Sequence, residues 1–224
     1  WLAPNRPDVV TLPAFFRSNG YVAAGAGKIF HHTAGSNPPV QWDAYHHLYF
    51  RESAWMRGSW LNYPWSPPTP RPGGFPYSGV AALDGEFDWG ALPIAVEDYD
   101  DVRTVDATVD FLQREQTKPF FLACGIFRPH LPWYAPQRWF DLYPLDKIVL
   151  PPVQADDLAD VPEIGRKWAQ AHREDGVKIA AVDATKRAIQ AYLASISFAD
   201  EQVGRLLAGN RPAGCGQLAD SSAR

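Results

Sequence analysis

The feature that most constrains the fold is an apolar run from Phe120 to Phe127, followed at once by the segment Arg-Pro-His-Leu-Pro at 128–132. The run shows no polar alternation, which favours a strand buried on both faces, as in a parallel sheet covered by helices. The two prolines end the strand because proline cannot continue the hydrogen-bond ladder. Ligands of open α/β sheets bind beyond the carboxyl ends of the strands, so Arg128 and His130 are expected where a ligand would lie.

A second strand end carries further candidate side chains. A short helix is predicted for residues 11–20 and a short strand for 21–24, after which two glycines let the chain turn at Lys28 and His31. If both strands are parallel, Lys28, His31 and His130 meet at one edge of the sheet. An ammonium group and imidazoles at one place can hold an oxyanion and transfer protons near neutral pH. The alternative is that the histidines have only structural roles.

The remaining periodicity completes an α/β pattern. Apolar residues recur at helical spacing in 100–114 and 184–207, and a short aromatic helix is expected at 136–143. A brief strand is predicted at 148–150 and an acidic loop at 153–165. Helices alternating with strands predict an α/β fold with a mostly parallel sheet flanked by helices.

Residues 33–95 are rich in tryptophan and proline and show no regular period. Disordered segments are poor in aromatic residues, so we expect a long loop that packs over the domain and walls a substrate cleft. Residues 208–224 lose both hydrophobicity and periodicity and are expected to form an atypical polar tail.

Composition excludes several classes of protein. A net charge of -4 and a pI of about 5.8 argue against a nucleic-acid partner. No apolar run approaches the roughly 20 residues that a membrane span needs. Cys124 and Cys215 form no disulfide framework. The paired histidines at 31–32 and 46–47 lack zinc-site spacing, so no metal site is expected. The oligomeric state stays open.

Three blocks of the chain carry a family resemblance. They lie in order between Thr11 and Leu207: Thr11-Leu-Pro with Asn19-Gly-Tyr-Val and Gly27-Lys-Ile-Phe-His31; Pro119-Phe-Phe-Leu-Ala with Arg128-Pro-His-Leu-Pro; and Tyr192-Leu-Ala-Ser-Ile-Ser-Phe-Ala-Asp-Glu. Together they resemble sulfatases of the alkaline phosphatase-like superfamily, most closely the iduronate-2-sulfatase-like group.

The resemblance implies that residues 1–207 form an incomplete sulfatase catalytic domain that hydrolyses a sulfated carbohydrate or a small sulfate ester. Such enzymes use calcium and a formylglycine nucleophile made from Cys or Ser. By resemblance, Lys28 contacts the formylglycine and the sulfate, and His31 assists proton transfer at the aldehyde hydrate. His130 binds sulfate or serves the leaving oxygen. A periplasmic, secreted or lysosomal-type compartment is expected by the same resemblance.

The sequence also departs from the family pattern in the motifs that supply the nucleophile and the metal ligands. The precursor motif Cys/Ser-x-Pro-Ser-Arg and the carboxylate metal motifs are absent from the sequence. We therefore expect an internal fragment that is inactive alone and holds no calcium ligands. A phosphoester hydrolase of the same superfamily and a non-catalytic carbohydrate-binding protein, which would use the tryptophans of 33–95, are the alternatives.

Overall fold

A computed structural model describes residues 8–30, 39–46, 76–80, 83, 87–152, 154, 156–170 and 173–209. The predictions for His31, for most of the 33–95 stretch and for the tail from residue 210 fall on residues outside the described ones. Within the described part, the chain is an α/β structure with parallel strands, as predicted.

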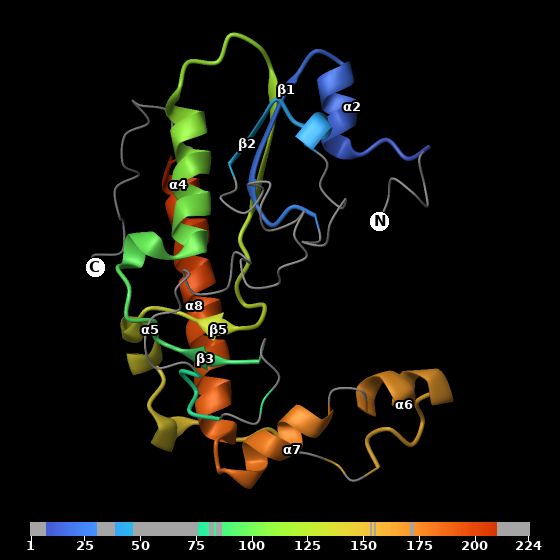
Figure 1. Ribbon diagram of the computed structural model, residues 1–224, viewed down its shortest axis with the longest axis vertical. Coiled ribbons are helices and arrows are strands. Elements are labelled where there is room, and N and C mark those ends of the chain that lie inside the picture. The colour runs from blue at the N-terminus through green and yellow to red at the C-terminus, as the bar shows by residue number, and fades with distance from the viewer. Residues whose placement is uncertain are drawn as a thin grey trace, which may run out of the picture.

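A three-stranded parallel sheet occupies one end of the molecule (Figure 1). Its order is β2 (Ala44–His46), β1 (Val22–Gly27) and β4 (Phe120–Gly125). The short helix α2 (Leu12–Ser18) covers one face, and α4 (Asp100–Gln113) covers the other (Figure 1). The sheet therefore has the helix-covered architecture that the apolar run indicated.

The prediction that the run from Phe120 is the strand buried on both faces is wrong in one respect. In the described sheet β4 lies at an edge and most of its residues are only half-buried, whereas β1 is central and buried from Ala23 to Gly27. The strand β1 also continues to Gly27, beyond the predicted end at residue 24. Its small side chains explain the difference, because they let both helices and two neighbouring strands approach closely.

Local sequence explains helix α2 well. Thr11 is its N-cap and accepts a hydrogen bond from the backbone N–H of Ala14 at 3.5 Å, and Pro13 lies in the first turn. Gly20 follows the helix with φ +84°, a conformation that glycine adopts without strain. The helix packs on the sheet through Phe16, whose ring stacks on that of Phe121 at 4.8 Å.

The main hydrophobic core lies at the other end, along the long helix α8 (Thr185–Gly209), which runs beside α4 (Figure 1). Its buried alanines and Phe198 recur at helical spacing, and Phe198 meets Tyr99 edge to face at 5.4 Å. This core also includes a two-stranded parallel ribbon, β3 (Trp89–Gly90) with β5 (Trp133–Tyr134), and the helix α5 (Gln137–Asp141).

One prediction about the second half of the chain is wrong, and another is right except at its end. No strand forms at 148–150, where a 3₁₀ helix (Leu145–Lys147) leads into a segment that pairs with no described strand. The described residues of the expected loop at 153–165 form turns and loop up to Pro162, where α6 (Glu163–Gln170) follows, and then α7 (Arg173–Ala181). An i,i+4 ion pair between Glu163 and Lys167 at 2.8 Å supports α6. The helices expected at 100–114, 136–143 and 184–207 are confirmed as α4, α5 and α8.

The described residues of the 33–95 stretch include both packed aromatic side chains and exposed positions such as Val40. Trp42 and Trp89 are buried, which agrees with the prediction that aromatic side chains hold this segment against the domain. Part of it also forms the strands β2 and β3, which the sequence did not predict. None of the described helices combines the length and apolar character needed to span a membrane.

Candidate active site

The candidate site begins where two parallel strands end together. In the ladder between β1 and β4, Val22 lies opposite Phe120 and Gly27 lies opposite Gly125. Both strands thus end in glycine at the same edge of the sheet. The backbone N–H of Lys28, the next residue after β1, donates a hydrogen bond to the carbonyl oxygen of Gly125 at 2.8 Å. The carboxyl edge predicted from the sequence therefore exists in the described structure.

Glycine is required at both strand ends. Gly27 has φ +74°, and a Cβ there would collide with the carbonyl oxygen of Gly125 and the side chain of Thr104. A Cβ on Gly125 would collide with the backbone of Lys28. The two glycines let the strand ends approach, and the Lys28 side chain starts from this contact.

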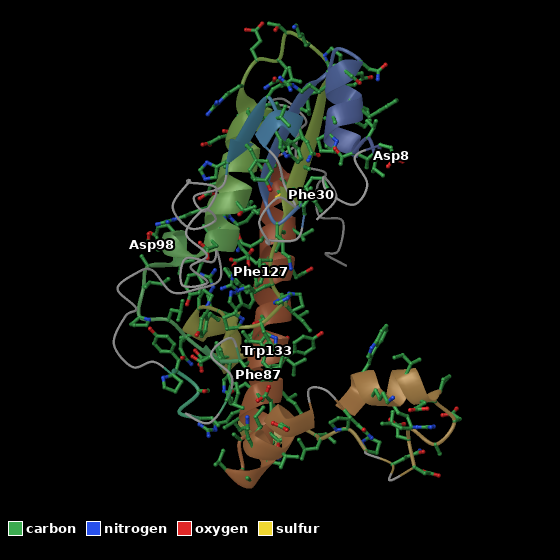
Figure 2. All side chains as sticks on the ribbon, turned by 45° about the vertical axis from the view of Figure 1, so that its right-hand side comes forward. Asp8, Phe30, Phe87, Asp98, Phe127 and Trp133 are labelled. Carbon is green, nitrogen blue, oxygen red and sulfur yellow. The ribbon has the colours of Figure 1, made fainter. Side chains whose placement is uncertain are left out.

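Lys28 and His130 both contact the aromatic ring of Phe127. The Nζ atom of Lys28 lies 4.8 Å from the ring centroid of Phe127, and the imidazole centroid of His130 lies 4.7 Å from it. Phe127 sits between the carboxyl edge of the sheet and the β5 end of the molecule (Figure 2). Of the three residues selected from the sequence, Lys28 and His130 both contact the Phe127 ring, whereas His31 lies outside the described residues.

The two side chains differ in their surroundings. Lys28 is half-buried, and this burial lowers the pKa of its ammonium group from 10.5. An ammonium that has lost part of its hydration gains more from a neighbouring anion than an exposed one does. The imidazole of His130 is exposed, and its Nδ1 lies 2.7 Å from the carbonyl oxygen of Leu131. Because a carbonyl only accepts, Nδ1 carries the proton and Nε2 is the nitrogen that can take up another.

The expectation that Arg128 faces a ligand is wrong. Its side chain is 1% exposed and pairs with that of Asp101, also 1% exposed, at 3.3 Å. The Nε of Arg128 donates a further hydrogen bond to the carbonyl oxygen of Tyr134 at 3.1 Å. Buried guanidinium groups need such partners because desolvation of an unpaired charge is very costly. Arg128 therefore belongs to the interior that supports the loop.

Asp101 and Phe127 are the residues that the sequence analysis missed. The sequence predicts a helix from residue 100, and α4 does begin at Asp100, but the spacing does not show that Asp101 reaches across to the end of β4. The apolar run predicts Phe127 as the last residue of a buried strand, whereas β4 ends at Gly125. The sequence does contain one indication of its role: Phe127 directly precedes the Arg-Pro-His segment that carries His130.

An aromatic group adjoins the loop that carries His130. The indole N–H of Trp133 donates to the carbonyl oxygen of Pro129 at 3.0 Å. Its ring meets those of Phe87 and Tyr192, each with a centroid separation of 5.4 Å, and Figure 2 shows Phe87 and Trp133 next to each other beside α8. The far end of the loop is therefore held by packing against the main core.

The described residues do not fit the two groups that the family resemblance implies. They contain no cluster of three or more His, Cys, Asp or Glu side chains able to hold a metal ion. The buried carboxylate of Asp88 already accepts from two backbone N–H groups and from the hydroxyl of Tyr134. Cys124 lies within β4, lacks the formylglycine precursor motif, and burial raises the pKa of its thiol. Neither calcium nor formylglycine has a place among these residues.

Comparison with known proteins supplies the family context for this geometry. The sequence model of the family described as Sulfatase matches residues 3–211. A protein named Sulfatase from Formosa agariphila is 36% identical over 210 residues, which cover 89% of this chain and 38% of the relative. The human Iduronate 2-sulfatase is 29% identical over 217 residues, covering 88% of this chain and 36% of its own length. The chain thus spans little more than a third of the length of these curated relatives.

Proposed function

The chain belongs to the sulfatase family, and we propose that it forms the middle section of a longer sulfuric ester hydrolase. The proposed substrate is a sulfated carbohydrate or a small sulfate ester, whose sulfate group binds between Lys28 and His130. The length of the relatives supports a longer enzyme, because the chain covers only 36–38% of them.

The observation that carries this proposal is the shared contact with Phe127. A cationic Nζ and an imidazole lie within 5 Å of one ring centroid, at the carboxyl edge of a parallel sheet. This edge is where open α/β sheets bind ligands. A tetrahedral anion placed there would meet a positive charge on one side and an N–H donor or proton carrier on the other.

Each residue then has a distinct role. Lys28 neutralises the sulfate oxygens, and its partial burial strengthens that attraction. His130, with Nδ1–H directed to the carbonyl oxygen of Leu131, uses Nε2 toward the substrate. When the imidazole is protonated, Nε2–H transfers its proton to the leaving oxygen or donates a hydrogen bond to the sulfate. His31 is assigned to proton transfer on the family resemblance alone.

The nucleophile and the calcium ligands are assigned to the parts of the longer enzyme that this chain does not span. No step is attributed to them here, because the described residues fit neither group. A periplasmic, secreted or lysosomal-type compartment is part of the same proposal and rests on family membership. Fractionation of cells that express the complete reading frame tests the compartment directly.

The test of the function starts from the coding DNA on both sides of the chain. We expect a Cys/Ser-x-Pro-Ser-Arg codon run upstream and carboxylate metal motifs on either side. The complete enzyme should then release sulfate from a panel that contains nitrophenyl sulfate, sulfated uronic acid disaccharides and choline sulfate. Matched phosphate esters and unsulfated sugars are the controls.

Three outcomes contradict the proposal. Faster hydrolysis of the phosphate esters would make the protein a phosphoester hydrolase of the same superfamily. Saturable binding of the sugars without turnover would favour a carbohydrate-binding protein. Sulfate release that is undiminished in a folded Lys28→Met, His130→Ala double variant would place the chemistry elsewhere in the enzyme.

A further inference from the structure

We propose that Asp101 is a positioning residue that holds the His130 loop against the Lys28 strand end, an inference that rests on the proposed function. Asp101 is the second residue of α4 and lies across from the end of β4, with a side chain that is 1% exposed. Burial keeps it away from substrate, so it acts only through the residues that it binds.

The carboxylate of Asp101 accepts hydrogen bonds from two consecutive residues just beyond the end of β4. Its Oδ1 accepts the backbone N–H of Phe127 at 2.6 Å, and its Oδ2 accepts the backbone N–H of Arg128 at 3.3 Å. Oδ2 also accepts from the Nη1 of Arg128 at 3.3 Å. A single side chain thus binds the main chain at the point where β4 becomes the loop. Charge-assisted hydrogen bonds of this kind are about twice as strong as neutral ones.

The other end of the loop is tied to the same pair. The Nε of Arg128 donates to the carbonyl oxygen of Tyr134, so the buried Asp101–Arg128 pair joins the start of the 128–134 loop to its end. His130 lies between these two attachment points, and its own backbone N–H donates to the carbonyl oxygen of Phe127 at 3.1 Å. The position of the imidazole therefore depends on a main chain that Asp101 holds at its start and that Arg128, the partner of Asp101, holds at its end.

Phe127 connects Asp101 to Lys28 as well. Asp101 binds the backbone N–H of Phe127, whose ring contacts both the Nζ of Lys28 and the imidazole of His130. A shift of the Phe127 backbone would move the ring that both side chains contact. A misplacement of about 1 Å in an active site can cost as much as 100-fold in rate. The Asp101–Arg128 pair, the most buried ion pair among the described residues, therefore lies where a small displacement would affect the site.

Stability alone does not account for an ion pair at this place. Buried ion pairs are often no more stabilising than well-packed apolar residues of similar volume, because of the desolvation of both charges. What an apolar pair cannot supply is acceptors for the N–H groups of Phe127 and Arg128, which point into the interior. The carboxylate satisfies both donors and sets the direction of the chain at the same time.

The test is a double-mutant cycle in the complete enzyme, with Asp101→Asn and His130→Ala made singly and together. The amide keeps the size of the side chain but removes the charge. We expect Asp101→Asn to lower kcat by about 10-fold to 100-fold with little change in KM. The loss should be larger for an alkyl sulfate than for nitrophenyl sulfate. In the His130→Ala background the same change should lower kcat by less than about 3-fold.

An equal loss in both backgrounds would overturn the proposal, because Asp101 would then act without His130. Asp98→Asn is the matched control, since Asp98 precedes the same helix but forms an exposed pair with Arg103. Its kcat should stay within about 2-fold of the wild type. If Asp101→Asn does not fold, Arg128→Lys replaces it in the cycle, because lysine keeps the charge but loses the planar fork that binds two acceptors.

A structural readout separates this inference from the proposed function. Crystal structures of the wild-type and Asp101→Asn proteins need no substrate. A His130 ring displaced from Phe127 supports the positioning role even if the enzyme proves to act on another ester. A ring that stays against Phe127 in the variant overturns it, even if sulfate esters are hydrolysed.

Discussion

Gly125 and Lys28 are in direct backbone contact at the carboxyl edge of the sheet: the N–H of Lys28 donates to the carbonyl oxygen of Gly125 at 2.8 Å. The contact leaves no space for a side chain on Gly125, because a Cβ would overlap the Lys28 backbone. The separation of the two strand ends, and with it the origin of the Lys28 side chain, is therefore set by a residue without a Cβ.

We expect Gly125→Ala to push Lys28 away and to lower both stability and activity. The overlap involves backbone atoms that cannot rotate aside, so the free energy of unfolding should fall by about 1–3 kcal/mol. Urea denaturation of the chain measures this change. Gly204→Ala is the matched control, because nothing lies within 4 Å of its added Cβ on helix α8. There, alanine should raise stability by up to about 1 kcal/mol, and a loss of equal size in both variants would contradict the contact.

The stability of the chain should depend on the protonation of Lys28. Burial lowers its pKa from 10.5, so between the lowered value and 10.5 the unfolded state binds more protons than the folded state. Stability contributed by this group therefore rises as pH increases through that window and is complete above 10.5. Urea denaturation between neutral pH and pH 10.5 should show the rise in the wild type and not in Lys28→Met. Lys147→Met, at a side chain that is 79% exposed, should keep it.

His130→Ala in the complete enzyme should lower kcat by roughly 100-fold or more, the scale of losing a general acid or an oxyanion donor. If His130 protonates the leaving oxygen, the defect should shrink for nitrophenyl sulfate, whose leaving group is already acidic. If it only binds sulfate, the loss should be similar for all leaving groups. Steady-state kinetics over a series of leaving groups decides between these roles. Unchanged kcat/KM for poor and good leaving groups alike, in a well-folded variant, would exclude both.

Arg128→Met should destabilise the chain by about 3–5 kcal/mol, because it leaves the Asp101 carboxylate buried without its cation. Arg103→Met provides the comparison. Arg103 pairs with Asp98 at 2.5 Å, but both side chains are at least 40% exposed, so its loss should cost less than about 1 kcal/mol. Chemical denaturation of the two variants measures both effects. Similar small losses would show that the Arg128 pair is not needed for folding.

The 224-residue chain by itself should hydrolyse no aryl sulfate. The sequence contains no Cys/Ser-x-Pro-Ser-Arg motif, and loss of a nucleophile removes most of an enzyme's acceleration. Incubation of the purified chain with nitrophenyl sulfate, with and without added calcium, tests this expectation. Turnover that a chelator suppresses would show that the chain carries a nucleophile and a metal site after all.

Local chemistry in the sequence was sufficient to predict the elements with strong periodicity or caps. The Thr11 cap with Pro13 marked α2, and the apolar stripes marked α4 and α8. The glycine and proline boundaries placed Lys28 and His130 just beyond two strand ends, which the parallel register of β1 and β4 confirms. Short-range patterns determine such features because caps, turns and helical faces involve residues only a few positions apart.

Only the tertiary structure decided which of these residues are buried and which meet. The sequence presented Arg128 and His130 as equivalent, yet a partner 27 positions away takes Arg128 into the interior and leaves His130 exposed. The strands β2, β3 and β5 were likewise not predictable, because two or three residues carry no period and form a strand only when a distant segment offers hydrogen bonds. Long-range pairing has no local signature, so the joint contact of Lys28 and His130 with Phe127 exists only in the folded chain.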